Sequence, residues 1–415
     1  MAADLDPASR AALGALLDRL EHARPTNIGF PGAVDFDYSA LAPLFAEHLL
    51  NNVGDPYIDG VALNHSKSFE REVVGFVAGL LRAPGQAWWG YVTGGGSEGT
   101  LYALHLARGL HPTGMVYVSQ AAHYSVHKAI DLLAMRSITV RATGTGEMDY
   151  QDLAGHVGRY PERPAIVVAN IGTTMTEAVD DVRRINRVLN TANVRHRFVH
   201  ADAALAGLPL ALLPPEKRPG FDFADGADSV IVSGHKFLGC PMPSGVVVVK
   251  ANHRLRLAQS VAYTGSPDTT ITGSRNGHTP LLLWYAIRRY GISGLRRRAE
   301  QSRSLAAYTL RRLTRIGWEA YRNPHAFTVV LRTPPSSVTN RWVLASSEGW
   351  SHIVCMPGVS RDQIDEFVDD LRAATEVSTP VFEERRRTTR RESSSRPKSR
   401  DDNRSRSAPG VRESA

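Results

Sequence analysis

The sequence has few cysteines and no long apolar run. Cys240 and Cys355 are the two cysteines among 415 residues, and neither has a histidine or cysteine neighbour at metal-binding spacing. This pattern argues against a disulfide framework and a zinc site. No apolar stretch approaches the length that spans a bilayer, and the first residues lack the apolar centre of a signal peptide. We therefore expect a cytoplasmic protein with no membrane association and no bound metal.

The chain also lacks a strong net charge once its last residues are set aside. The formal net charge is +8, but residues 385–415 contain eleven Lys or Arg and four Asp or Glu, which leaves the rest of the chain at +1. These residues are rich in Ser, Arg and Pro, so we expect a disordered basic tail over residues 381–415. Anion binding through this tail is an alternative function that predicts steeply salt-dependent binding of nucleic acid, which we do not expect as the main partner.

Apolar runs alternate with helical segments from about residue 90 onward. Near-continuous runs of Val, Ile and Ala predict strands that are buried on both faces, at residues 115–118, 138–141, 165–169, 197–200, 229–232 and 246–249. Strands of this kind, separated by helices, predict an α/β fold with a mostly parallel central sheet and helices on both faces. Apolar spacing predicts further helices at residues 8–22, 38–50 and 66–82.

The region after residue 275 has a different pattern. A long helical region, residues 281–313, is interrupted at residues 291–294, and short strands follow at 328–331 and 352–355. Ser360 and Gln363 form a capping box that begins a last helix. We expect a smaller C-terminal α+β domain. The predicted organisation is an N-terminal helical segment, a large domain, the small domain and the basic tail, at residues 1–60, 61–274, 275–380 and 381–415.

Ligands of open α/β sheets bind at the carboxyl ends of the strands, so the residues that follow each strand are the first candidates for a site. The loop Thr93–Gly99 precedes a helix, whose free backbone N–H groups favour an anion. It also contains a formal G-x-G-x-x-G pattern, but the next strand ends in Ser119 and Gln120 without an acidic residue for a ribose. We favour a single phosphate over a dinucleotide, and a simple turn is the structural alternative.

Three further residues follow predicted strands. Lys236 ends Ser-Gly-His-Lys after a buried strand, where it is either a surface lysine or an amine that binds an aldehyde as a Schiff base. Asp202 is either a helix cap or the counter-charge of a buried cation, and His123 is either structural or catalytic. Pyridoxal phosphate needs a phosphate loop, a flat group over its ring, a carboxylate and a lysine. The four features occur here in that order.

Ten short segments carry a more specific resemblance. Between Asn27 and about Val377 the chain resembles the pyridoxal-phosphate-dependent group II amino-acid decarboxylases, and most of all the bacterial histidine decarboxylases and plant serine decarboxylases. One departure is that bacterial relatives usually have Asn-Gly-Gly where this chain has Gly94-Gly95-Gly96. The segments are Asn-Ile-Gly-Phe-Pro (27–31), Phe-Asp-Tyr (36–38), Trp-Gly-Tyr-Val-Thr (89–93), Gly-Gly-Ser-Glu-Gly (95–99), His-Tyr-Ser-Val (123–126), Asn-Ile-Gly-Thr-Thr (170–174), Ala-Val-Asp-Asp (178–181), His-Ala-Asp-Ala-Ala (200–204), Val-Ser-Gly-His-Lys (232–236) and Thr-Gly-Ser-Arg-Asn-Gly-His (272–278).

The resemblance implies a fold-type I enzyme, similar in architecture to aspartate aminotransferase, that works as a homodimer or homotetramer with its site at the subunit interface. It implies that Lys236, Asp202 and His123 are catalytic. Lys236 would bind the cofactor aldehyde, Asp202 would pair with the pyridinium nitrogen, and His123 would stack on the ring. The other residues implied to contact the cofactor are Gly95, Gly96, Ser97, Ser233 and His235 at the phosphate, Ala204 on the other ring face, and Thr173 beside the ring or substrate.

The implied reaction is decarboxylation of an L-amino acid to its amine and CO2. L-Histidine is our first choice of substrate, because bacterial relatives that resemble the chain this closely are mostly assigned to histidine, and L-serine and L-valine are the alternatives. Serine is included because Gly54-Asp55-Pro56 and residues 237–243 resemble the plant serine enzymes. Another pyridoxal-phosphate reaction, such as transamination, is possible on the same scaffold. A nicotinamide-dependent oxidoreductase is the alternative from a different class. The donor of the α-proton is not indicated by the sequence, and residues 263–274 form the candidate mobile loop.

Overall fold

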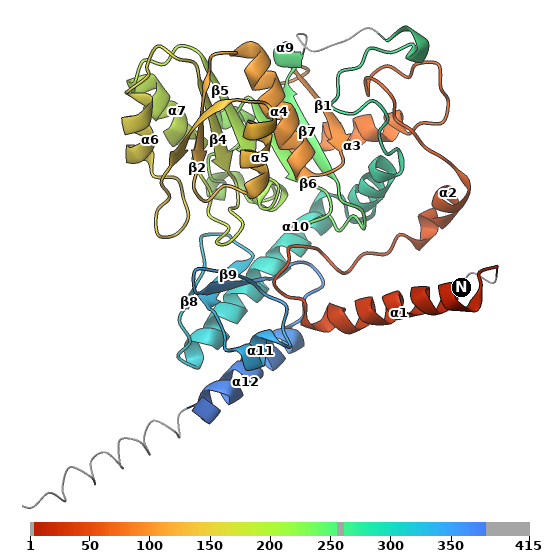
Figure 1. Cartoon of the computed structure of the whole chain (residues 1–415), viewed down its shortest axis with the longest axis vertical. Coiled ribbons are helices and arrows are strands. Elements are labelled where there is room, and N and C mark those ends of the chain that lie inside the picture. The colour runs from red at the N-terminus through yellow and green to blue at the C-terminus, as the bar shows by residue number, and fades with distance from the viewer. Residues whose placement is uncertain (1–3, 255–260, 379–415) are drawn as a thin grey trace, which may run out of the picture.

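A computed structural model describes residues 4–254 and 261–378, and the predicted basic tail at 381–415 lies outside the described residues. The described chain contains a seven-stranded sheet and a separate four-stranded sheet (Figure 1). None of the described helices combines the length and the apolar character needed to cross a bilayer.

The seven-stranded sheet is mostly parallel, as predicted. Its strand order is β1-β7-β6-β5-β4-β2-β3, and β7 alone runs antiparallel to both of its neighbours. Six of its strands match predicted runs to within two residues. The strands are β1 (Trp88–Thr93), β2 (Met115–Ser119), β3 (Arg136–Val140), β4 (Ala165–Asn170), β5 (Arg197–Asp202), β6 (Ser229–Ser233) and β7 (Gly245–Lys250).

Strand β1 was not predicted, because its sequence Trp-Trp-Gly-Tyr-Val-Thr lacks the Val/Ile run of the other strands. Gly90 interrupts the pattern for a steric reason. A Cβ at this position would lie 2.3 Å from the Val247 carbonyl oxygen on β7 and 2.9 Å from Val74 Cγ1. Glycine therefore permits close packing of β1 between the neighbouring strand and a covering helix.

Helices cover both faces of the large sheet, which confirms the predicted layers. The first face is covered by α4 (Gly96–Leu110) and α5 (Tyr124–Leu132), whose apolar residues form a cluster with β2, β4 and β5. The opposite face is covered by three helices whose buried residues belong to the largest apolar cluster. These helices are α3 (Lys67–Leu80), α6 (Tyr150–Val157) and α7 (Val182–Thr191).

The N-terminal segment contains less helix than predicted. Helix α1 (Pro7–Ala23) confirms the first prediction, and Asp6 caps it by accepting hydrogen bonds from Ala8 and Ser9 N–H. The predicted helix at 38–50 is limited to a 3-10 turn, Ser39–Leu41, and to α2 (Ala42–Glu47). It ends early because His48 has an extended backbone and no residue of α2 is buried, so packing does not prolong it.

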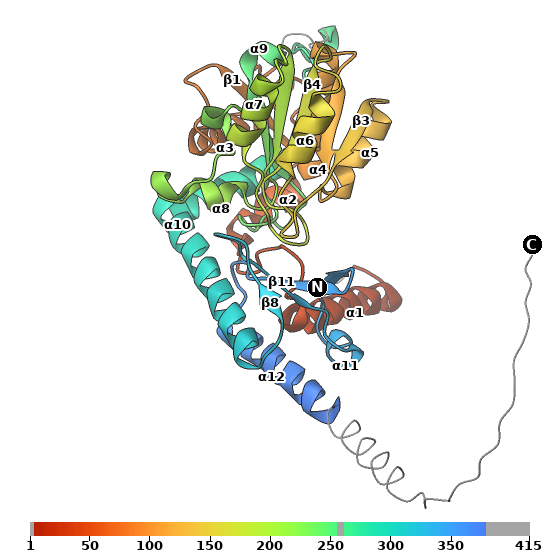
Figure 2. The same cartoon turned by 90° about the vertical axis from the view of Figure 1, so that its left-hand side faces the viewer.

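Helix α10 (His278–Arg315) connects the two sheets (Figure 2). Its backbone leaves the helical conformation at Gly291 (φ 57°, ψ 178°), as the predicted interruption requires. The small sheet has the strand order β10-β11-β9-β8, and the capping box of α12 is present, because Gln363 N–H donates to Ser360 Oγ and Ser360 N–H donates to Gln363 Oε1. The remaining elements of this domain are β8 (Ala320–Tyr321), β9 (Thr328–Arg332), α11 (Ser336–Thr339), β10 (Ala345–Ser347), β11 (Trp350–Val354) and α12 (Arg361–Ser378).

The small sheet has its own apolar core, which includes the predicted face of α12 at Ile364, Phe367, Val368 and Leu371. We propose that the two domains divide near residue 275, just before α10, with residues 1–60 as a separate N-terminal segment and the small domain ending near residue 380. Limited proteolysis would test these boundaries, because linkers are cut before packed elements.

Candidate active site

The candidate residues lie at one edge of the large sheet. Strands β1, β2, β4, β5 and β6 run in the same direction, so their carboxyl ends meet there, and the antiparallel β7 begins at the same edge. The strand register pairs Thr93 with Gly245 and Gly245 with Ser233. It also pairs Asn170 with Asp202. Segments that are far apart in the sequence are therefore neighbours at this edge, as the strand-end rule predicts.

The glycine-rich loop leads directly into α4. Gly95 is the N-cap residue and Gly96 the first helical residue, so the first N–H groups of the helix have no carbonyl partners within it. Ser97 is exposed, and its hydroxyl has no hydrogen bond to another described residue. The Glu98 carboxylate holds the loop by accepting hydrogen bonds from Gly94 N–H at 2.7 Å and from Tyr91 Oη at 2.9 Å. This stabilising role of Glu98 was not predicted.

Gly96, Ser233 and Ala204 lie together. A Cβ at Gly96 would be 3.2 Å from Ser233 Oγ and 3.3 Å from Ala204 Cβ, so a larger residue would intrude on the space between the helix start and the two strand ends. Ser233 N–H donates to the Ala204 carbonyl at 3.2 Å. Ser233 is buried as a residue, and its hydroxyl has no hydrogen-bond partner among the described residues. These groups form a small cradle of helix N–H groups and hydroxyls.

Lys236 lies in the turn after β6 and is partly buried. Its carbonyl accepts hydrogen bonds from Ala33 N–H at 3.1 Å and Gly239 N–H at 3.2 Å, whereas its amine has no hydrogen bond or ion pair among the described residues. Burial lowers the pKa of the Lys236 amine, and the carboxylates of Asp202 and Glu177 oppose this effect. The interpretation of Lys236 as an ordinary surface lysine does not fit these surroundings.

His235 is fixed by a contact that the sequence did not indicate. Its Nδ1 atom lies 2.9 Å from the Ser244 carbonyl oxygen and 3.1 Å from Ser244 N, just before β7. Burial lowers the pKa of the His235 imidazole, as does the Lys236 ammonium. The turn between β6 and β7 therefore holds a histidine that is disfavoured as an imidazolium next to the Lys236 amine.

Asp202 ends β5 and does not cap a helix. Its carboxylate accepts one long hydrogen bond, from Ala204 N–H at 3.3 Å, and the N-cap of the next helix, α8 (Gly207–Ala211), is Ala206. His200, two residues earlier on the same face of β5, is buried with Nδ1 2.8 Å from Ser229 Oγ. Burial lowers the pKa of His200 to about 4, against the opposing charge of Asp202. Asp202 therefore keeps most of its capacity to accept hydrogen bonds.

His123 combines a structural role with a place in the cluster. It is the N-cap of α5, and its Nδ1 accepts a hydrogen bond from Ser125 N–H at 3.3 Å and lies 2.7 Å from Ser125 Oγ. Because Nδ1 accepts, the proton of the neutral ring is assigned to Nε2. Burial lowers the pKa of His123, the Asp202 carboxylate raises it, and the Lys236 ammonium lowers it further. The three residues implied to be catalytic are thus in electrostatic contact.

Thr173 lies in the turn after β4, where its hydroxyl already has partners. Thr173 Oγ1 accepts a hydrogen bond from Ala178 N–H at 3.0 Å and lies 2.8 Å from Thr176 Oγ1. The same turn carries Glu177, a buried carboxylate that was not predicted and whose charge acts on Lys236. Its partners begin 150 residues later, at Phe327, so no local pattern in the sequence indicates it.

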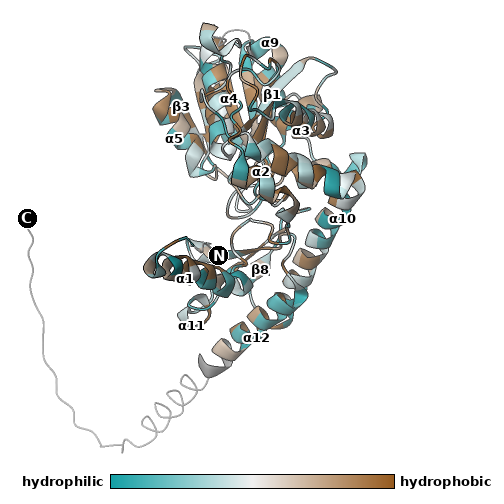
Figure 3. Cartoon of the chain, turned by 90° about the vertical axis from the view of Figure 1, so that its right-hand side faces the viewer, coloured by the Kyte–Doolittle hydropathy of each residue, from teal (hydrophilic) through white to brown (hydrophobic). Residues whose placement is uncertain are grey.

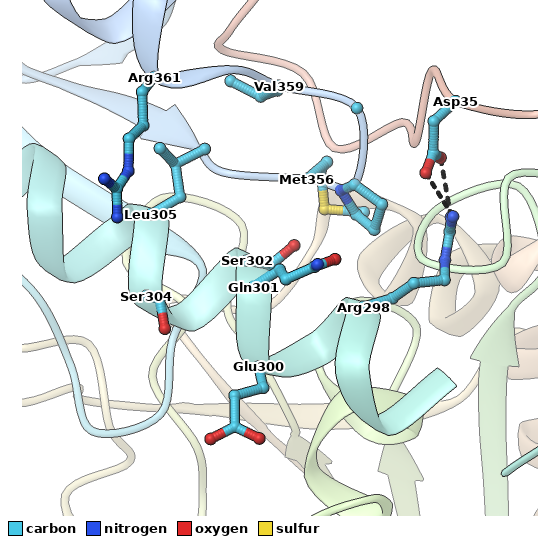
Figure 4. A pocket seen from close by; sticks show the side chains of 12 residues that line it. Asp35, Arg298, Glu300, Gln301, Ser302, Ser304, Leu305, Met356, Val359 and Arg361 are labelled. Atoms are coloured by element: carbon cyan, nitrogen blue, oxygen red, sulfur yellow. Dashed lines mark hydrogen bonds and ion pairs between the residues drawn. The ribbon is translucent and has the colours of Figure 1, made fainter. Parts of the chain in front are cut away.

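A cavity of about 360 Å³ lies elsewhere, between α10 and the loop before α12 (Figure 4). Its lining includes Met356, Arg361 and the ion pair of Arg298 with Asp35, in which Arg298 Nη2 is 2.8 Å from Asp35 Oδ1. No residue of the strand-end cluster lines it. Within the described residues, no group of three His, Cys, Asp or Glu side chains is placed to hold a metal ion.

Comparison with known proteins identifies the family of this chain. The pyridoxal-dependent decarboxylase conserved domain matches residues 35–319. Histidine decarboxylase of Mesorhizobium japonicum is 46% identical over 367 residues, which cover 88% of this chain and 98% of that protein. The family is therefore established. The chain belongs to the pyridoxal-dependent decarboxylases.

Other relatives of this decarboxylase agree with the resemblance found in its motifs. Serine decarboxylase 2 of Oryza sativa is 38% identical over 86% of this chain and 76% of that protein. The crystal structure of L-methionine decarboxylase from Streptomyces sp. 590 has a TM-score of 0.81 and 26% identity, and the match covers 89% of this chain and 95% of that chain. The predicted fold-type I architecture, the decarboxylase activity and the cofactor pyridoxal phosphate are confirmed.

Proposed function

We propose that this enzyme decarboxylates L-histidine to histamine and CO2. The observation that carries the proposal is the 46% identity with the Mesorhizobium japonicum histidine decarboxylase across nearly its whole length. Histidine decarboxylase of Morganella morganii, 40% identical over 84% of this chain, supports it. Overall, the substrate loses CO2 and its α-carbon gains a proton. The amine product keeps the imidazole.

The strand-end residues fit pyridoxal phosphate. When bound, the cofactor supplies an aldehyde that bonds to amines and a ring that accepts the electron pair left by CO2. The unpaired amine of Lys236 suits the aldehyde. We propose that Gly95 and Gly96 N–H groups, with the hydroxyls of Ser97 and Ser233, bind the phosphate, because these donors have no partners of their own among the described residues.

The remaining predicted roles are part of the same proposal. Asp202 has free acceptor capacity for the pyridinium N–H, and His123 is oriented by Ser125 so that its ring can stack on the cofactor. Ala204, beside Gly96, would lie against the opposite ring face, and His235 would support the phosphate side. Thr173 would lie beside the ring or substrate and be oriented by the hydrogen bonds of its turn. These side chains would orient the substrate carboxylate and limit the access of water.

The segments that resemble serine decarboxylases give little support for serine. Asp55 is buried, and its carboxylate accepts hydrogen bonds from Tyr57 N–H at 2.8 Å and Thr269 Oγ1 at 2.9 Å. Phe237 is also buried, and its ring lies 6.0 Å from that of Phe327. Both segments pack within the chain, so their resemblance to the serine enzymes can be explained by packing and does not indicate the substrate.

The test is kcat/KM for L-histidine, L-serine and L-valine under identical conditions. A site that hydrogen-bonds the imidazole should reject valine by a large factor, because valine would leave buried polar groups unpaired. We expect histidine to exceed both by at least about tenfold, or roughly 1.4 kcal/mol of transition-state binding. A kcat/KM for serine or valine that exceeds the value for histidine by the same factor would overturn the assignment of L-histidine as the substrate. Formation of a keto acid in place of CO2 and amine would indicate transamination.

We also propose that the enzyme is a homodimer or homotetramer in the cytoplasm. Residues 5–63 contain twelve of the eighteen large apolar side chains that are exposed in the described chain. Four of them, Leu13, Leu16, Leu17 and Leu20, have the i, i+3, i+4, i+7 spacing of one face of α1, which stands apart from the large sheet (Figures 1 and 3). Multi-angle light scattering measures the subunit number, and a monomeric mass would refute the oligomer.

The unpaired state of Cys240 and Cys355 supports a reducing compartment, which cell fractionation tests.

A further inference from the structure

Glu177 has a backbone conformation that is unfavourable for its residue type. It is 2% exposed, in the turn between β4 and α7, and its φ angle is +52°. The left-handed region costs a residue with a Cβ about 1–2 kcal/mol and is usually occupied by glycine. An acidic residue that is both buried and in this conformation needs compensating interactions, and strain of this kind is concentrated near functional sites.

The compensation comes from the small domain. Glu177 Oε2 accepts hydrogen bonds from Phe327 N–H at 2.9 Å, from Thr328 N–H at 2.8 Å and from Thr328 Oγ1 at 2.6 Å, at the start of β9. The other oxygen, Oε1, has no hydrogen bond to a described residue. One carboxylate oxygen therefore anchors the turn. Burial raises the pKa of Glu177, and the hydrogen bonds from Thr328 and Phe327 and the charge of Arg303 oppose this effect, so the anchor also favours the ionised carboxylate.

The two residues before Glu177 are held by the same domain. Asn323 Nδ2 donates to the Thr176 carbonyl at 2.9 Å, and His352 Nδ1 lies 3.1 Å from the Met175 carbonyl oxygen. Three consecutive residues of the turn thus contact the small domain. Because Thr173 belongs to this turn, the small domain determines where the turn lies relative to the strand-end cluster.

The charged groups around Glu177 come from several elements. The residue next to Lys236 lies near this anchor, since the ring of Phe237 is 6.0 Å from the ring of Phe327, and the charge of Glu177 acts on the Lys236 amine. Arg303 on α10 places its guanidinium carbon 5.7 Å from the centre of the Phe327 ring, donates from Nη2 to the Pro209 carbonyl, and has a buried Nε without a hydrogen-bond partner. Asp202 is the other carboxylate whose charge acts on Lys236, and His123 and His235 also lie beside this amine.

We propose that Glu177 is a positioning residue of this decarboxylase, whose carboxylate fixes the turn after β4 to the small domain and supplies, with Asp202, the negative charge that faces the Lys236 amine. The inference rests on the proposed role of Lys236. A second carboxylate favours the ammonium form and offsets part of the effect of burial. Its anchor in β9 couples the position of the small domain to the charge state of the lysine.

The test measures the pKa of Lys236 directly in the full-length chain after removal of the cofactor. The sequence contains six lysines, so reductive methylation with ¹³C-formaldehyde gives a simple NMR spectrum, and Lys236→Arg assigns the resonance. Glu177→Gln removes the charge at constant side-chain length. We expect it to lower the pKa of Lys236 by about one unit. Thr328→Val, the matched control, removes one of the three hydrogen bonds to Oε2 and retains the carboxylate. Because that hydrogen bond lowers the pKa of Glu177, the pKa of Lys236 is measured at a pH well above the titration of the carboxylate, and it should shift by less than about 0.3 units.

An unchanged pKa in a folded Glu177→Gln protein would overturn the proposal, as would an equal shift in Thr328→Val. If Glu177→Gln does not fold, Arg303→Met provides the reciprocal measurement. It removes the cation whose charge acts on Glu177, so the carboxylate charge is less compensated and the pKa of Lys236 should rise. The absence of a rise would again refute the proposal. Failure of the proposed role of Lys236 is recognised separately, because Lys236→Arg would then still take up pyridoxal phosphate covalently.

Discussion

Asp202→Asn separates charge from shape at the carboxyl end of β5. Asparagine has nearly the same size as aspartate and keeps an acceptor oxygen for the Ala204 N–H, which is the hydrogen bond that the structure shows at 3.3 Å. Asparagine and aspartate are also about equally good helix caps. The substitution therefore removes the negative charge and leaves the local geometry unchanged.

The size of the loss in rate depends on which group the Asp202 carboxylate contacts. If Asp202 served only the Ala204 N–H, the loss would be under about 0.5 kcal/mol and the rate would change by less than a factor of about two. If the carboxylate pairs with the pyridinium of the cofactor, the substitution breaks a buried charge pair, which costs about 3–5 kcal/mol. We expect kcat to fall by a factor of about 10² to 10⁴, with an unchanged thermal midpoint.

The assay is release of CO2 and amine at saturating substrate and cofactor. Asp181→Asn is the matched control, because Asp181 is a true helix cap that accepts hydrogen bonds from Arg183 N–H at 2.8 Å and Arg184 N–H at 3.1 Å. It should leave both rate and stability nearly unchanged. A loss of less than about tenfold in Asp202→Asn, or roughly 1.4 kcal/mol, would refute the assigned role.

Three further results are expected. Lys236→Ala should abolish turnover and the absorbance of the lysine–cofactor bond, and retained activity would refute its role. Burial lowers the pKa of His200 to about 4, so as the pH falls the unfolded chain takes up a proton at a higher pH than the folded protein does. The free energy of unfolding should therefore decrease by up to roughly 3 kcal/mol as the pH drops from about 6.5 toward 4. His200→Asn should flatten this dependence, which is measured as Tm against pH. Arg275→Ala leaves the buried Glu70 carboxylate without its cation and should lower the free energy of unfolding in urea by about 3–5 kcal/mol, whereas Arg288→Ala, at an exposed ion pair, should cost less than about 1 kcal/mol.

Local patterns in the sequence predicted those parts of the fold that depend on local causes. The Val/Ile runs of β4, β6 and β7 are strands because both of their faces are buried, and the Ser360–Gln363 box begins α12 through contacts three residues apart. Strand β1 was not predicted because Gly90 is required by contacts with α3 and β7, which are distant in the sequence. Tertiary packing therefore explains this glycine.

The residues of the candidate site divide in the same way, into those indicated by local sequence and those that depend on tertiary contacts. Lys236 and Asp202 could be proposed as site residues because each follows a buried strand, and parallel strands place their carboxyl ends together whatever the loops contain. Ser244, beside His235, and Glu98, beside Gly94, could not be identified, because their roles depend on the geometry of turns. Glu177 is the extreme case, since its partners belong to the other domain.

This difference has a consequence for how the enzyme is organised. The strand ends of the large domain carry the groups that we propose to bind the cofactor, whereas the small domain positions the turn that carries Thr173 and Glu177. A displacement of β9 relative to the large sheet would have to move this turn or break the hydrogen bonds to one buried carboxylate oxygen. Breaking them is costly, because a buried carboxylate without its donors loses several kcal/mol. The turn should therefore move with the small domain, and the charge that faces Lys236 should move with it.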